Sequence, residues 1–172
     1  MIKDLLDAEM AKIDYGWLDK DGGRHERLHG FKDGYILQTP DELRESRLGV
    51  CWDQVELERD ILERSGIDAH AYFVVYYNGA MDPSHTFILF ENDGKVVWYE
   101  HAWEKHRGWH EFDSFEDALR DVREKFIEME LSGVELNPMN LCIYEYEAPT
   151  QKLSCMEFYS HCGAGKSVNE DL

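Results

Sequence analysis

The chain has 172 residues, a length that fits a single domain over 1–172, and its 43% hydrophobic and 13% aromatic content supplies a core. Its 36 acidic and 18 basic residues leave a net charge of −18, which repels phosphate backbones and anionic membrane surfaces. Composition therefore excludes a wholly disordered chain, and we expect neither nucleic acid nor a membrane as a partner.

Hydropathy and cysteine usage predict a cytoplasmic protein. The longest apolar run covers 71–77, whereas a membrane-spanning helix needs about 20 residues. Met1 opens a charged amphipathic stretch that lacks the apolar segment of an export signal. The four cysteines have irregular spacing and match no disulfide framework, so we expect free thiols in a reducing compartment.

The first third of the chain predicts three helices. Apolar residues recur at helical spacing over 2–13, ahead of a short aromatic stretch and a glycine-rich loop. Thr39, with Pro40 after it and an acid three residues on, predicts a helix start, and we expect that helix to end at Gly49. The third helix is predicted over 51–65, with three charged residues pointing into solvent, namely Glu56, Arg59 and Glu63.

The middle of the chain predicts an antiparallel meander of three strands. These strands are expected over 71–77, 86–90 and 96–100, and a tight hairpin at 92–94 joins the last two. The strand over 71–77 is apolar on both faces, so we expect it to be central in the sheet.

The last third predicts two more helical segments and one more strand. Ser114 resembles the start of a capping box, and apolar residues then follow helical spacing to residue 129. A strand is predicted over 140–147 and a helical segment over 150–162. We expect the residues from Gly163 onward to be frayed.

Cys51 has the sequence environment of a nucleophile. A glycine turn at 47–50 delivers its thiol to the positive end of a predicted helix, which favours the thiolate. Asp53, in the same first turn, opposes that effect, so a cationic partner is needed. The sequence offers His85 as that partner.

Hairpin geometry supplies His85 with a carboxylate. If Asp93 and Gly94 form a two-residue turn, Asn92 pairs with Lys95. Counting back along the two strands then places His85 and Glu100 on one face of the sheet. They are diagonal neighbours, close enough for the carboxylate to reach the imidazole. His101 faces the other side by parity. A nucleophile, a base and an orienting acid are the groups that acyl transfer needs.

Three segments carry this trio: Arg47-Leu48-Gly49-Val50-Cys51, Ser84-His85-Thr86-Phe87 and Val97-Trp98-Tyr99-Glu100. Their order resembles that of the transglutaminase-like superfamily of papain-fold cysteine enzymes. The intervals, 34 residues from the cysteine to the histidine and 15 from there to the acid, are similar too. The resemblance covers about residues 39–104.

This resemblance implies an α+β, papain-like core in which the nucleophile helix packs on an antiparallel sheet. It also implies acyl transfer or hydrolysis on a protein or peptide amide, of transglutaminase, deamidase or peptidase type. Cys51 would be the nucleophile, His85 the general acid and base, and Glu100 the group that orients the imidazole. Water or an amine would resolve the Cys51 thioester, with no cofactor or metal. The family usually has aspartate in place of Glu100 and tryptophan in place of Phe87.

These two departures, with the acidic charge, also support a second hypothesis, a catalytically silent papain-like domain used as an acidic binding module. Under the enzyme hypothesis, two donors are expected to bind the oxyanion, namely the Cys51 backbone N–H and one upstream side chain. Three candidates are equal for that role: Trp17, His29 and Gln38.

Two other residue groups have less specific patterns. The spacing of His101, His106 and His110 matches no compact metal site, so we expect no metal there. Aromatic residues near the triad either line a substrate groove or pack in the core. They are Trp98, Tyr99, Trp103 and Trp109.

Overall fold

The computed structural model describes residues 1–79 and 82–172 and has a mixed α+β architecture. The helices are α1 (Ile2–Met10), α2 (Phe31–Gly34), α3 (Pro40–Ser46), α4 (Cys51–Arg64), α5 (Phe115–Glu130) and α6 (Cys155–Gly163), with 3-10 turns η1 (Glu104–His106), η2 (Pro138–Asn140) and η3 (Asn169–Asp171). The strands are β1 (Asp14–Tyr15), β2 (Trp17–Leu18), β3 (Arg24–His25), β4 (Leu48–Gly49), β5 (Ala69–Tyr76), β6 (Ser84–Asn92), β7 (Lys95–Glu100), β8 (Gly108–Phe112), β9 (Leu141–Tyr146) and β10 (Lys166–Ser167).

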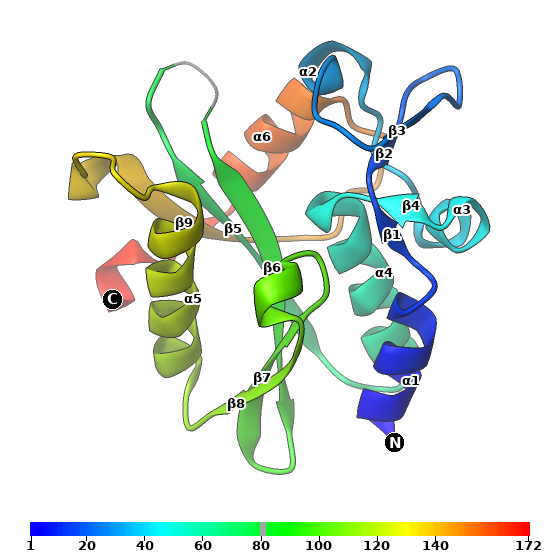
Figure 1. Ribbon diagram of the computed structural model, residues 1–172. Coiled ribbons are helices and arrows are strands. Elements are labelled where there is room, and N and C mark those ends of the chain that lie inside the picture. The colour runs from blue at the N-terminus through cyan, green and yellow to red at the C-terminus, as the bar shows by residue number, and fades with distance from the viewer. Residues whose placement is uncertain (80–81) are drawn as a thin grey trace.

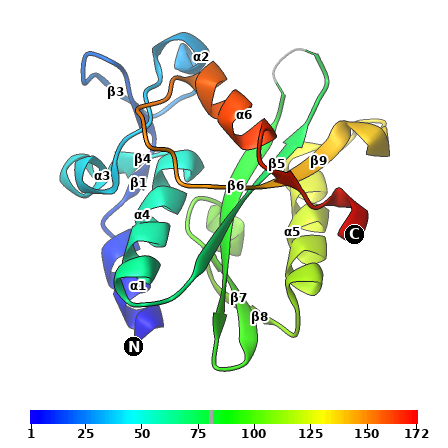
Figure 2. The same cartoon turned by 180° about the vertical axis from the view of Figure 1, so that it is seen from behind.

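A six-stranded antiparallel sheet forms the centre of the molecule, in the order β10-β9-β5-β6-β7-β8 (Figure 1). The helices α1, α4 and α6 lie on one face of the sheet, and α5 lies on the other (Figure 2). Within the two described ranges, no helix combines the length and apolar character needed to cross a bilayer.

The predicted meander and the predicted helix at Cys51 are both present. β5, β6 and β7 are consecutive neighbours, and α4 runs to Arg64. Asp93 and Gly94 have φ angles of 50° and 76°, the left-handed values that a tight two-residue hairpin turn needs. Asn92 therefore pairs with Lys95, as the sequence predicts.

The helix that begins after Thr39 ends earlier than predicted. α3 stops at Ser46 because Arg47 adopts a left-handed conformation with φ of 58°. Gly49 lies instead in β4, where an added Cβ atom would come within 2.7 Å of a Leu43 side-chain carbon. Close packing, rather than helix termination, is therefore what requires glycine at this position.

The solvent-facing side predicted for α4 is wrong at Glu56 and Arg59. Both side chains are buried, and they form an ion pair at 3.0 Å. The Arg59 guanidinium also donates to the carbonyl oxygen of Tyr146 at 3.3 Å and lies over its ring. The end of β9 lies against this face through Tyr146, and His161 of α6 is near enough to act on the charge of Glu56, whereas Glu63 is exposed as predicted.

The outer strands of the sheet include two that the sequence did not predict. β8 pairs with β7, and β10 pairs with β9. The segment from Gly163 onward, predicted to be frayed, therefore contains a strand and a 3-10 turn. In the segment 150–162, the helix begins only at Cys155, because the Ser154 hydroxyl accepts from the Glu157 N–H and caps it.

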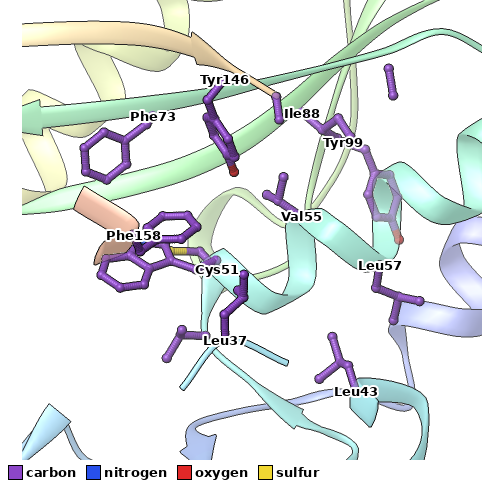
Figure 3. Packing of buried hydrophobic residues seen from close by; sticks show 14 of the residues in the cluster. Leu37, Leu43, Cys51, Val55, Leu57, Phe73, Ile88, Tyr99, Tyr146 and Phe158 are labelled. Atoms are coloured by element: carbon purple, nitrogen blue, oxygen red, sulfur yellow. The ribbon is translucent and has the colours of Figure 1, made fainter. Parts of the chain in front are cut away.

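Two hydrophobic clusters pack against opposite faces of the sheet. In the cluster that α4 shares with α6, Phe158 stacks on Trp52 with ring centroids 4.2 Å apart (Figure 3). The same ring meets Phe73 and Tyr146 edge-on. Phe158 thus attaches α6 to the first turn of α4 and to the sheet.

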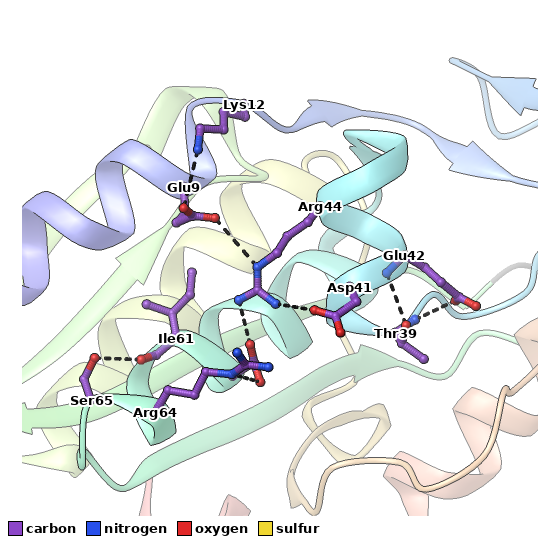
Figure 4. Close-up of polar contacts among 10 residues, drawn as sticks. Glu9, Lys12, Thr39, Asp41, Glu42, Arg44, Ile61, Arg64 and Ser65 are labelled. Carbon is purple, nitrogen blue, oxygen red and sulfur yellow. Dashed lines mark hydrogen bonds and ion pairs between the residues drawn. The ribbon is translucent and has the colours of Figure 1, made fainter.

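A network of ion pairs joins α1, α3 and α4. Arg44 contacts Asp60 at 2.6 Å, Asp41 at 2.9 Å and Glu9 at 3.7 Å (Figure 4). Arg64 contacts the other oxygen of Asp60 at 2.9 Å. These pairs are partly exposed, so solvent screens them, and they contribute more to helix placement than to stability.

We expect Phe158→Ala to lower the free energy of unfolding by about 3–5 kcal/mol, because it removes a fully buried ring and leaves a cavity. Urea denaturation followed by circular dichroism measures this change. Met156→Ala, two residues away in the same helix, is the matched control, since Met156 is 55% exposed. Equal effects of the two substitutions would contradict the role of Phe158 in docking α6.

Candidate active site

Cys51 occupies the first position of α4 and lines a groove of about 400 Å³. β4 pairs in parallel with β1, with Tyr15 opposite Gly49, so two short strands hold the chain that leads into the helix. The thiol is 7% exposed. Its position at a helix N-terminus, where backbone N–H groups lack helical partners, favours a negative charge on sulfur.

His85 and Glu100 lie on one face of the sheet, as the hairpin register predicts. The imidazole Nε2 donates to Oε2 of Glu100 at 2.9 Å. The carboxylate also accepts from the Trp98 indole N–H at 3.2 Å and from the Trp103 backbone N–H at 2.8 Å. Three donors therefore compensate a carboxylate that is only 3% exposed.

Cys51 is the other group that acts on the imidazole of His85, and its side chain raises the pKa of that imidazole. Because Nε2 already faces Glu100, Nδ1 is the ring nitrogen that remains for the thiol. Burial lowers the pKa of His85, but the charge of Glu100, the hydrogen bond to Glu100 and the neighbouring Cys51 side chain outweigh burial and raise the pKa to about 10. The site thus favours an imidazolium beside the sulfur.

Trp103 covers one side of the imidazole. Its ring is stacked on that of His85, with centroids 3.6 Å apart and planes 9° from parallel. Phe87 is farther away, with a centroid distance of 6.4 Å. The aromatic cover of His85 therefore comes from the chain after Glu100, and sequence spacing does not reveal it.

Asp53 does not face the thiol. Its buried carboxylate accepts hydrogen bonds from the Tyr35 hydroxyl and from the backbone N–H groups of Gln38 and Val50, at 2.8 to 3.1 Å. Burial raises the pKa of Asp53 to about 7, and these three hydrogen bonds oppose the rise. The carboxylate thus fastens the turn before Cys51 to the segment after α2.

A further buried carboxyl group, that of Glu58, lies close to Cys51 and Glu100. Glu58, Gln54 and Thr86 surround a small interior space that also borders Cys51 and Glu100. Among the described residues, Oε1 of Gln54 and Oγ1 of Thr86 have no hydrogen-bond partner. Burial, followed by the charge of Glu100, raises the pKa of Glu58 well above its usual value. A protonated Glu58 can therefore supply a donor in this space.

The walls of the groove come from segments far apart in the sequence. They include α2, the chain before β6, the end of α5 and α6. The lining residues besides Cys51 are Tyr15, Leu28, Phe31, Lys32, Val50, Trp52, Asp82, Pro83, Ser84, Glu130, Cys155, Met156 and Tyr159. Of these, sequence reasoning identified none as part of a groove.

The aromatic residues considered for the groove lie elsewhere. Trp98, Tyr99 and Trp103 are buried, and Trp109 is half-buried on β8, where it packs edge-on against Phe90. Of the two predicted roles for these residues, packing in the core is the one that the structure shows.

None of the three candidate oxyanion donors lines the Cys51 groove. The Trp17 indole donates to the Arg27 carbonyl oxygen at 2.8 Å. The Gln38 amide is engaged by Leu48 and Ser46, and His29 lines a separate hollow.

The predicted histidine group is dispersed. His101 contacts the carbonyl oxygen of Ile13 through Nε2 and thus lies away from His85, as parity predicts. His110 contacts the carbonyl oxygen of His106. Over residues 1–79 and 82–172, no group of three or more potential ligands has the arrangement of a metal site. All four cysteines are free.

Comparison with known proteins leaves the family open. No protein-family model matches this chain, and no curated protein sequence matches it. The geometry of the site itself is therefore what indicates its chemistry.

We expect Asp53→Asn to lower the free energy of unfolding by about 1–3 kcal/mol, because the new NH₂ group faces a buried N–H donor. Chemical denaturation measures the effect. Glu157→Gln is the matched control, since Glu157 holds the equivalent third position of α6 but is exposed. Similar stability of both variants and the parent chain would contradict the role given to Asp53.

A second prediction concerns Glu58 and pH. Because its pKa is raised on folding, the folded chain holds a proton that the unfolded chain releases, so stability falls as pH rises above the ordinary carboxyl range. Relative to Glu58→Gln, the parent chain should lose about 1.4 kcal/mol for each pH unit in that window. Denaturation curves at several pH values test this, with exposed Glu63→Gln as control. Parallel pH profiles for the parent chain and Glu58→Gln would refute it.

Proposed function

We propose that this protein is a cysteine-dependent acyltransferase or amide hydrolase that works through a thioester on Cys51. The observation that carries the proposal is the buried hydrogen bond between Glu100 and His85, whose imidazole is under the influence of Cys51 at the edge of a groove. This arrangement resembles a papain-like core of the transglutaminase-like type. The contacts match the roles of nucleophile, general acid and base, and orienting acid.

In the proposed first step, the Cys51 thiolate attacks the carbonyl carbon of an amide held in the groove. A carbon–sulfur bond forms, and the carbonyl electron pair moves onto oxygen. When the intermediate collapses, the carbon–nitrogen bond breaks and the His85 imidazolium gives its proton to the departing amine. A thioester remains on Cys51.

In the second step, His85 removes a proton from the acceptor while the acceptor attacks the thioester. Water as acceptor yields a carboxylic acid, and an amine yields a new amide. Either way the proton taken from the acceptor stays on His85, and the Cys51 thiolate leaves. The groove opens to solvent and has both apolar and charged walls, which suits a protein or peptide amide as substrate. The proposal places the protein in a reducing compartment such as the cytoplasm, where the thiols stay free.

We expect Cys51 to react with iodoacetamide near pH 6 faster than the other cysteines, by on the order of 100-fold over a thiol of ordinary pKa. Burial raises the pKa of both Cys155 and Cys162, which slows them further. Peptide mass spectrometry of the folded protein quantifies each cysteine.

His85→Gln should remove the advantage of Cys51, and His70→Gln, on the same sheet but paired with Glu145, is the matched control. Circular dichroism verifies that each variant is folded. Labelling of Cys51 no faster than that of Cys142 would contradict the proposal and favour the catalytically silent binding module.

A further inference from the structure

The groove contains two side-chain donors that the triad does not use and that no other described residue engages. Ser84 and Tyr159 have their hydroxyl oxygens 3.3 Å apart, and Tyr159 donates to the carbonyl oxygen of Asp82 at 2.6 Å. Across the part of the chain that the structure describes, the Tyr15 hydroxyl and the Lys32 ammonium have no hydrogen-bond partner. These two groups are therefore available to a ligand in the groove.

Backbone pairing positions Tyr15 beside the nucleophile. Tyr15 lies opposite Gly49 in the β1–β4 pair, and Gly49 is two residues before Cys51. Gly16 follows, and an added Cβ there would come within 2.6 Å of the His25 carbonyl oxygen. The chain directly after Tyr15 is thus packed tightly against β3, while Tyr15 itself pairs with β4.

The charges that act on the Tyr15 hydroxyl include those of Cys51 and Glu100 in the candidate site. Tyr15 is 44% exposed as a whole, but desolvation at its hydroxyl end, followed by the charge of Cys51, raises the pKa of Tyr15. The phenol therefore keeps its proton at neutral and mildly alkaline pH and stays a donor. The Lys32 ammonium, by contrast with the Tyr15 hydroxyl, acts on a different cysteine, because its charge opposes the rise that burial causes in the pKa of Cys155.

We propose that the Tyr15 hydroxyl donates a hydrogen bond to the oxyanion that forms when Cys51 attacks a carbonyl carbon, together with the Cys51 backbone N–H. This inference rests on the proposed function. Tyr15 keeps its proton throughout: its hydrogen bond stabilises the negative oxygen until the carbonyl re-forms and the leaving group departs. Tyr15 would then be a catalytic residue, in the role for which Trp17, His29 and Gln38 were candidates.

Two reagents separate this role from activation of the thiol. Acylation of Cys51 by p-nitrophenyl acetate passes through an oxyanion and releases p-nitrophenolate, whereas alkylation by iodoacetamide forms no oxyanion. We expect Tyr15→Phe to slow acylation about tenfold or more and to leave alkylation of Cys51 unchanged. Cys51→Ala supplies the background rate. Tyr77→Phe is the matched control, because Tyr77 has similar exposure and lies outside the groove.

Each result decides between the two proposals. If Cys51 alkylates rapidly and acylation by Tyr15→Phe equals that of the parent chain, the role of Tyr15 is overturned and the proposed function stands. Equal slowing of both reactions also overturns it, since Tyr15 would then act on the thiol. If the parent Cys51 neither alkylates rapidly nor is acylated, the proposed function fails, and this inference fails with it.

Discussion

The carboxylate of Glu100 is the constraint around which the site is arranged. A charged group this deeply buried is tolerated only when donors surround it, and His85, Trp98 and Trp103 supply them. These hydrogen bonds fix the orientation of the imidazole. They also bring the chain after β7 back over the sheet, so that the Trp103 ring stacks on His85.

The Cys51 side of the candidate site depends on another buried carboxylate, that of Asp53. Asp53 links the turn at Val50 to Tyr35 and Gln38, while the absence of a side chain at Gly49 lets α3 and α4 approach closely. The turn before Cys51 is thus held by the polar contacts of Asp53, and the His85 imidazole is held by its hydrogen bond to Glu100 within the sheet. Packing of α4 on the sheet joins these two halves.

Local rules were sufficient for much of the fold. A two-residue turn with Gly94 permits one register between β6 and β7, and a period of two then assigns His85 and Glu100 to one face. Burial of charged residues could not be predicted in the same way. Glu56 and Arg59 follow a solvent-facing helical pattern, but the end of β9, about 90 residues later in the chain, supplies a carbonyl partner for the guanidinium. Helical periodicity contains no information about such a partner.

The sequence by itself determined the elements of the site: a cysteine at a helix start, and a histidine and an acid in register on paired strands. Short-range sterics and hydrogen-bond periodicity control these features, so they can be read from neighbouring residues. Only the tertiary structure decided what surrounds them. Tyr15, Trp103 and Tyr159 reach the site through strand pairing, loop return and docking of α6, and each of these depends on contacts between residues distant in the chain.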